Sequence, residues 1–207
     1  MHIHAKTIRV AENKEAFRQD LRSLARALWI GLVGVEEFTG RMFTLTNDYF
    51  SEAFFAGAKT VGIEPSELTF EEQLALRGLL TRQHPYIQGL AFWIWDNRKE
   101  ADGVWGHVVN RLSLWVNTYV DFKNQGAAIA ARDLKLEWRL HEVRKTDKPC
   151  DDCLNLAGRI YRASTWRRWG IYPQSRALKC GGWLCGCGFV PTKDRATPGR
   201  PPKLTYQ

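Results

Sequence analysis

The chain has 207 residues, of which 44% are hydrophobic and 25% charged, and its formal net charge is +8 at pH 7. This composition is ordinary for a globular protein of one domain or two small ones. The most apolar run, Ala25 to Val35, is far shorter than the ~20 residues that cross a bilayer, which argues against a membrane partner. Residues 1–20 are polar and charged and carry no secretory signal, so we expect a soluble protein made in a reducing cytosol.

The first 130 or so residues show the spacing of amphipathic helices. Apolar residues recur every three or four positions in two stretches, which predicts a helix in each. Gly31 and Gly34 lie between the stretches and are expected to separate the two helices. The apolar positions are Phe17, Leu21, Leu24 and Leu28, followed by Phe38, Met42, Leu45 and Tyr49.

Three further helices are expected after a break marked by Gly57, Gly62 and Pro65. Thr69 and Glu72 have the spacing of a capping box, which predicts a helix through Leu80. Another helix is expected to start near Pro85. The last runs from about Val104 to Arg132, with one apolar face formed by Val108, Leu112, Trp115, Tyr119 and Phe122.

The periodicity changes at Leu134. Apolar and polar residues alternate from Leu134 to His141, the pattern of a half-buried strand, and Arg159 to Arg162 is predicted as a short return strand. The last residues are rich in Pro, Lys and Arg and predict a flexible or extended tail. The expected fold is a mainly α N-terminal domain over 1–132, a small α+β zinc-stabilised C-terminal module over 133–190, and a basic Pro-rich tail over 191–207.

All five cysteines lie in the last third of the chain. Cys150 and Cys153 form a Cys-x-x-Cys pair beside Pro149, and Cys180, Cys185 and Cys187 follow in a glycine-containing segment. In a reducing compartment such clusters favour a metal site over disulfides, and two turns of soft donors suit tetrahedral zinc. A redox role for the pair is less favoured, because we do not expect the motif to open a helix after a strand of a βαβ unit.

A zinc ion needs four donors, and five cysteines are present. Cys150, Cys153 and Cys180 are the expected ligands, with Cys185 or Cys187 as the fourth and the spare cysteine packed as a small apolar side chain. A fully thiolate site has no open position for water, so the zinc is expected to be structural. Asp151 and Asp152 are interpreted as shaping the thiolate turn rather than as catalytic groups.

The positive charge is concentrated beside the cysteines. From Arg159 to the end there are ten basic residues and one acid, a net charge of +9, which leaves −1 for the preceding 158 residues. Such a segment is typical of contact with nucleic acid or with an acidic protein surface. For Trp166 and Trp169, cover for a small zinc core is the favoured interpretation, and contact with bases or a partner is the other one. The candidate contact residues are Arg162, Trp166, Arg167, Arg168, Trp169, Arg176 and Lys179.

No sequence pattern of an enzyme accompanies these features. The chain has no Gly-x-Ser-x-Gly, no phosphate loop and no His-Glu-x-x-His, and no histidine lies between Cys150 and Cys187. The chain is therefore expected not to be an enzyme. A metal-dependent nuclease built on the cysteines is the enzymatic alternative, and the missing histidine weighs against it.

The C-terminal half resembles the phage head morphogenesis proteins, the family of the phage Mu F protein, also called minor head proteins. The resemblance covers about Arg111 to Phe189. It begins with a helical lead-in and the strand Leu136-Glu137-Trp138, and the run from Asp147 to Tyr161 is similar to the family's signature of Asp, Cys-x-x-Cys, Leu, a small residue and Gly. The closing cluster resembles a terminal His or Cys followed by Cys-x-Cys, although Cys180 stands five residues before Cys185 where many members have a His three before.

The resemblance implies a virion component that lies inside the head near the portal, and in the host cytoplasm during assembly. It further implies partners in the portal or the major capsid protein and a role in capsid assembly, with DNA contact during packaging left open. The alternative from the residues themselves is a stand-alone zinc-ribbon regulator that binds DNA.

Overall fold

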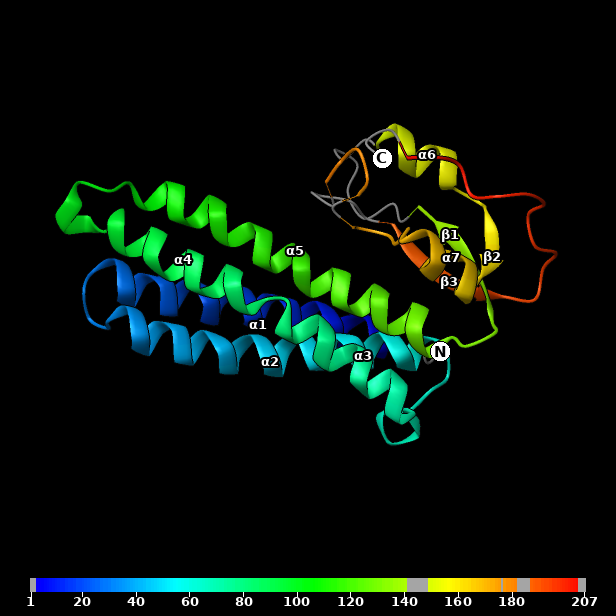
Figure 1. The fold of residues 1–207 in the computed structure, drawn as a ribbon, viewed down its shortest axis with the longest axis horizontal. Coiled ribbons are helices and arrows are strands. Elements are labelled where there is room, and N and C mark those ends of the chain that lie inside the picture. The colour runs from blue at the N-terminus through cyan, green and yellow to red at the C-terminus, as the bar shows by residue number, and fades with distance from the viewer. Residues whose placement is uncertain (1–2, 141–148, 176, 182–186, 205–207) are drawn as a thin grey trace. The chain divides into compact units, whose positions relative to one another are not determined.

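The chain folds into five long helices followed by short strands and helices (Figure 1). The computed structural model describes residues 3–140, 149–175, 177–181 and 187–204. The helical part comprises α1 (Ile3–Trp29), α2 (Val35–Thr60), α3 (Phe70–Thr81), α4 (His84–Asp96) and α5 (Trp105–Ala130), with short 3-10 turns at Pro65–Glu67 and Lys99–Ala101. The remainder comprises β1 (Lys135–Arg139), α6 (Asp151–Leu156), β2 (Ile160–Arg162), α7 (Ala163–Trp169) and β3 (Gly188–Thr192).

This order confirms the expected fold class of a mainly α N-terminal part followed by a small α+β module. The chain divides into two compact units, one of residues 1–52 and 76–119 and the other of residues 53–75 and 120–207. The change from helix to strand, between Ala130 and Lys135, lies inside the second unit. None of the described helices is long and apolar enough to cross a membrane.

In the first unit, most of the apolar residues that predicted the first two helices are buried in the core. Phe17, Leu21 and Leu28 of α1 are fully buried, as are Phe38 and Met42 of α2. The ring of Phe17 lies 5.3 Å from that of Tyr49, 5.4 Å from that of Phe50 and 6.0 Å from that of Tyr119, measured between centroids. Gly31, with φ of 75°, adopts a left-handed conformation in the turn after α1, where glycine carries no steric penalty.

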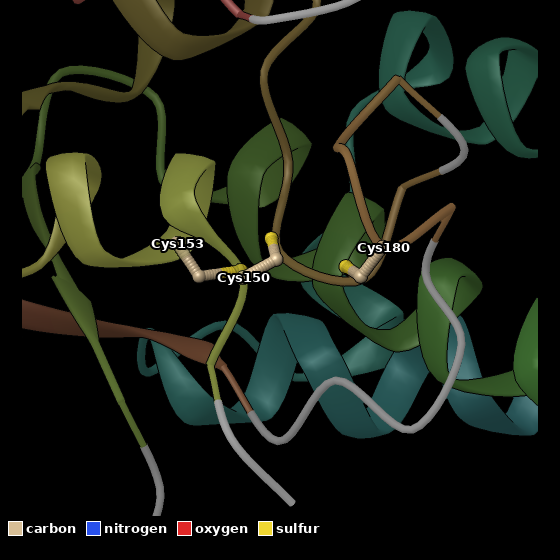
Figure 2. Close-up of side chains that lie close together, drawn as sticks. All are labelled: Cys150, Cys153 and Cys180. Atoms are coloured by element: carbon tan, nitrogen blue, oxygen red, sulfur yellow. The ribbon is translucent and has the colours of Figure 1, made fainter.

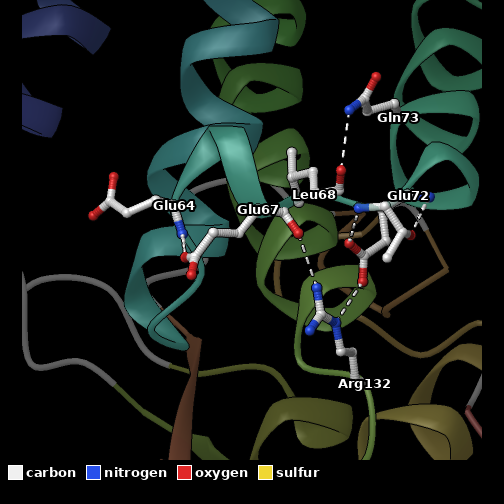
Figure 3. A network of polar contacts seen from close by, with 7 residues as sticks. Glu64, Glu67, Leu68, Glu72, Gln73 and Arg132 are labelled. Atoms are coloured by element: carbon white, nitrogen blue, oxygen red, sulfur yellow. Dashed lines mark hydrogen bonds and ion pairs between the residues drawn. The ribbon is translucent and has the colours of Figure 1, made fainter.

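The capping box predicted at the start of α3 is confirmed. The backbone N–H of Thr69 donates to Glu72 Oε2 at 2.8 Å, and the N–H of Glu72 donates to Thr69 Oγ1 at 3.3 Å. Figure 3 shows how Arg132, beyond the end of α5, joins this cap: its Nε donates to Glu72 Oε1 at 3.1 Å and its guanidinium donates to the carbonyl of Glu67 at 3.0 Å. The buried carboxylate of Glu72 therefore links the start of α3 to the segment that leads into β1.

The predicted break is present between Thr60 and Phe70, where it contains Gly62 and Pro65. Gly57 does not belong to it, because α2 continues to Thr60. Gly57 instead allows a close approach between two helices of the second unit. A Cβ atom at Gly57 would lie 1.8 Å from the carbonyl oxygen of Lys123 on α5, and one at Gly126 would lie 2.1 Å from the carbonyl oxygen of Phe54. Only glycine fits at both positions, so α2 and α5 meet there with their backbones in contact.

The three strands form one antiparallel sheet in the order β2-β1-β3. The two predicted strands are confirmed as β1 and β2, and Leu136 and Trp138 of β1 are fully buried, as their alternation indicated. In the register, Leu136 pairs with Tyr161 of β2 and Trp138 with Phe189 of β3. The strand β3 was not predicted, since its five residues begin with glycine and include Pro191, which is tolerated because β3 is an edge strand.

The residues expected to form a flexible tail pack against the sheet. Pro191 and Thr192 belong to β3, and the segment beyond them returns to β2, where the N–H of Thr197 donates to the carbonyl of Ile160 at 2.8 Å. The hydroxyl of Tyr161 donates to the carbonyl of Arg200 at 3.2 Å, and Leu204 is buried. The proline content therefore correctly indicated an extended segment, but hydrogen bonds to Ile160 and Tyr161 hold this segment against β2.

The contact at Gly57 gives a prediction on stability. Replacement Gly57→Ala should reduce the free energy of unfolding by about 3 kcal/mol, because the new methyl group would overlap the backbone of α5. Gly40→Ala in the same helix is the matched control, since no atom lies within 4 Å of its Cβ position. That change should raise stability by up to about 1 kcal/mol through helix propensity. Urea denaturation of both variants measures the difference, and equal effects would contradict the close approach.

The cap at Glu72 gives a prediction on pH. Burial by itself raises the pKa of Glu72, but the hydrogen bonds from Arg132 and from the N–H of Thr69 lower the pKa below its ordinary value. The contribution of the ionised carboxylate to stability is therefore complete above the unfolded-state pKa of about 4.3 and is lost as the pH falls through the lower folded-state pKa.

We expect Glu72→Gln to be less stable than the wild type at pH 7 and to lose less stability on acidification from about pH 5 to pH 3. The control is Glu71→Gln, which changes an exposed neighbour in the same helical turn. Thermal unfolding measured across this pH range is the test. A Glu72→Gln profile parallel to that of the wild type would disprove the assignment.

Candidate metal centre

The first two candidate ligands are held at the start of α6. Cys150 is the N-cap residue, with an extended backbone (φ −73°, ψ 163°), and its carbonyl accepts the N–H of Leu154 at 2.9 Å. Cys153 lies in the first turn and is buried. The Cys-x-x-Cys motif therefore opens a short helix that the sequence analysis did not predict. The sheet beside it is antiparallel, however, so the motif does not stand in a βαβ unit.

The third candidate ligand comes from a turn 27 residues later in the chain. Cys180 lies in the turn of residues 177–181, which is closed by a hydrogen bond from the N–H of Gly181 to the carbonyl of Leu178 at 2.6 Å. Gly181 has a positive φ of 58°, which favours glycine at the end of the turn. Figure 2 shows the side chains of Cys150, Cys153 and Cys180 lying together, with all three sulfur atoms within 4.8 Å of one another.

This spacing fits a metal ion bound by thiolates. With Zn–S bonds of about 2.3 Å, tetrahedral geometry places two sulfur ligands ~3.8 Å apart, so the thiols need to move together by no more than about 1 Å. One of the three cysteines is buried and the other two are half-buried. Two segments distant in the sequence thus bring three soft donors to one point, and this group can hold a metal ion.

Carboxylates of α6 hold the turn that carries Cys180. The N–H of Lys179 donates to Oδ2 of Asp152 at 2.7 Å, and the Lys179 ammonium group forms an ion pair with Asp151. Asp152 is buried, with 2% of its surface exposed. The interpretation that these two residues shape the thiolate turn is consistent with these contacts, although the sequence did not indicate that they act across 27 residues.

Of the two other cysteines, the structure describes Cys187 only. Cys187 is buried and immediately precedes β3, and its carbonyl accepts a hydrogen bond from Gln174 Nε2 at 3.1 Å. It is not a member of the three-thiol group. Cys185 lies outside the described residues. The candidates for the fourth donor are therefore still Cys185 and Cys187.

Trp166, which the sequence suggested as a contact residue, belongs to the core of the module. It is fully buried, and its indole N–H donates to the carbonyl of Leu136 at 3.0 Å. Its ring lies 5.7 Å from that of Trp138, 5.0 Å from that of Tyr161 and 5.2 Å from that of Phe189. The favoured interpretation of Trp166 as cover for a small core agrees with this burial, because a short three-stranded sheet needs a large apolar side chain to cover it.

The other candidate contact residues differ in exposure. Arg162, Arg167, Arg168 and Lys179 are exposed, Trp169 is half-buried, and Arg176 lies outside the described residues. The guanidinium group of Arg200 lies 5.9 Å from the centre of the Trp169 ring. Arg162 approaches Asp133 at 3.8 Å, but no carboxylate among the described residues lies within 4.0 Å of Arg167, Arg168 or Arg200. Four of the seven predicted residues thus present charge at the surface.

A scan of protein-family models and searches of curated proteins and of solved structures each return no match to this chain.

The three-thiol group predicts the metal content of the purified protein. We expect one zinc ion per chain by plasma mass spectrometry, and a large loss of zinc in Cys150→Ser, Cys153→Ser and Cys180→Ser. Of Cys185→Ser and Cys187→Ser, only the one that removes the fourth donor should lose zinc, so each serves as the control for the other. Folded wild-type protein without bound zinc would contradict the assignment.

Proposed function

We propose that this chain is a phage minor head protein, a non-enzymatic virion component whose C-terminal module is stabilised by a structural zinc ion. The observation that carries the proposal is the convergence of Cys150, Cys153 and Cys180 on one point. These residues come from the two cysteine segments that resemble the family signature. A resemblance in sequence order alone does not require that the two segments meet in space.

A zinc ion at this site would act by cross-linking α6 to the turn of residues 177–181. Four thiolate ligands leave no coordination position for water or substrate, which favours a structural over a catalytic ion. Binding of zinc to such sites in small peptides is worth about 10–16 kcal/mol. That is ample to hold the turn of residues 177–181 against α6.

The positive surface of the module supports contact with packaged DNA. The strand β2 leads directly into α7, which carries Arg167 and Arg168, and the segment of residues 193–200 is hydrogen-bonded to β2. Cations from three segments therefore surround one strand–helix junction. The module exposes the large hydrophobic side chains of Leu134 and Leu154, but none of the described residues of β2, α7 and the segment 193–200 does so. Phosphate groups need no apolar centre in an interface, whereas the core of most protein partners does.

The proposed place of the protein is inside the phage head near the portal, after assembly in the host cytoplasm. The portal or the major capsid protein is the proposed partner. The second candidate function, a zinc-ribbon regulator that binds host or phage DNA, draws on the same positive surface. It differs in requiring sequence preference, which exposed arginines alone do not provide.

Mass spectrometry of purified virions and proheads of the phage that encodes this chain tests the proposal. We expect the protein in both particles, in fewer copies than the major capsid protein. Absence from both particles, together with sequence-selective binding of duplex DNA by the free protein, would overturn the proposal in favour of the regulator. The salt dependence of DNA binding should be steep in either case, so selectivity is the deciding measurement.

A further inference from the structure

One residue next to the third thiol is held from two sides by α6. Lys179 directly precedes Cys180, and both of its hydrogen-bonding nitrogens contact aspartates of α6: the backbone N–H contacts Asp152 and the ammonium group contacts Asp151. The two contacts differ in their surroundings. Asp152 is 2% exposed, whereas 66% of the Asp151 side chain and 41% of the Lys179 side chain are exposed.

The difference in burial between Asp152 and Asp151 indicates which of the two contacts fixes the turn. An ion pair between exposed side chains contributes little, because water and salt screen it and both side chains lose conformational freedom. A buried carboxylate that accepts a backbone N–H has no such competition, and leaving it without a donor is costly. The backbone N–H of Lys179 is also part of the peptide chain that continues into Cys180, so fixing it restricts the position of the thiol.

Asp152 itself is not one of the clustered metal donors, which are Cys150, Cys153 and Cys180. It lies between the two cysteines of α6 in the sequence, and its carboxylate contacts the turn that carries the third cysteine. Its position therefore suits an action on the metal through Cys180 rather than by direct coordination.

We propose that Asp152 is the positioning residue of the metal centre: its buried carboxylate holds the backbone of Lys179 so that Cys180 stays within coordination distance of Cys150 and Cys153 before the metal binds. This inference rests on the metal site of the proposed function. Removal of residues that orient metal ligands lowers metal affinity by about 10–100-fold in other proteins. The same range is expected for loss of the Asp152 carboxylate.

The test is a zinc titration of the full chain against a chromophoric chelator, with four variants. Asp152→Ala should bind zinc 10–100-fold more weakly than the wild type. Asp152→Asn keeps an oxygen that can accept the N–H and should recover most of the affinity. Asp151→Ala is the matched control on the neighbouring residue and should change the affinity by less than about threefold. Asp152→Glu, which moves the carboxylate by one methylene, replaces Asp152→Ala if that variant does not fold.

A double-mutant cycle separates positioning from general destabilisation. If Asp152 acts through Cys180, then Asp152→Ala should cause no further loss of affinity in a Cys180→Ser background. Alkylation mapped by mass spectrometry gives a second readout: in zinc-loaded Asp152→Ala, Cys180 should react while Cys150 and Cys153 remain protected.

The outcomes distinguish the two levels of the proposal. Folded wild-type protein that binds no zinc would overturn the metal site and the role of Asp152 together. Wild-type protein that binds zinc, with equal affinity in Asp152→Ala, would overturn the role of Asp152 alone. A loss of affinity that is additive in the Cys180→Ser background would also overturn it, because the residue would then act on the fold and not on the thiol.

Discussion

The hydrogen bond between the buried carboxylate of Asp152 and the backbone of Lys179 is the constraint on which the candidate site depends. It joins α6 to a turn that lies 27 residues further along the chain, and it does so one residue before Cys180. A Cys-x-x-Cys motif supplies only two donors at the start of a helix, and two thiols do not complete a tetrahedral site. Cys180 supplies the third donor because this hydrogen bond fixes the main chain of the turn, and the main chain in turn sets the position of the Cys180 side chain.

A second set of interactions supports the site from the other end of α6. Through Gly158, which has a positive φ of 71°, the chain turns from α6 into β2, and the N–H of Gly158 donates to the carbonyl of Trp138 at 2.9 Å. Trp138 and Trp166 form the apolar centre on which the three strands pack. The short helix α6 is thus fixed at its C-terminal end by the aromatic core and at its N-terminal end by the thiol cluster and the Lys179 contact. A metal ion at the cluster would therefore act on the end of α6 that the core does not hold.

The sequence predicted local structure well and long-range placement only in part. Helical spacing, the Thr69–Glu72 capping box and the alternation around Trp138 are patterns within one element, and all three are present in the structure. The failures concern features set by tertiary contacts. Glycine often marks a helix break, but Gly57 lies inside α2. A glycine is required there because the backbone of α5 occupies the space where a side chain would be. Trp166 lies in a basic stretch typical of a contact surface, yet the sheet needs it as cover.

For the candidate site, the sequence identified the residue types but not the contacts that assemble them. The spacing of Cys150 and Cys153 suffices to predict a shared metal ion, and Cys180 was grouped with them by residue type alone. Nothing in the sequence separates Asp151 from Asp152, since the two neighbours have the same chemistry. The structure separates them by burial: one carboxylate faces water and pairs with a flexible ammonium group, and the other is enclosed and binds a backbone N–H.

The position of the charges relative to the thiol cluster bears on the two candidate functions. Residues 150–207, which include all five cysteines, hold ten basic residues and three acids, a net charge of +7. Four thiolates around a zinc ion carry a net charge of −2, so a filled site reduces this charge to +5 without changing its sign. The cations at the junction of β2 and α7 are attached to the aromatic core, and Lys179, which lies beside the thiols, is already paired with Asp151. The positive surface is therefore expected to persist whether or not metal is bound. On this argument the metal determines the order of the module near Cys180, and contact with phosphate depends on the sheet and α7, so the two properties are separable by mutation.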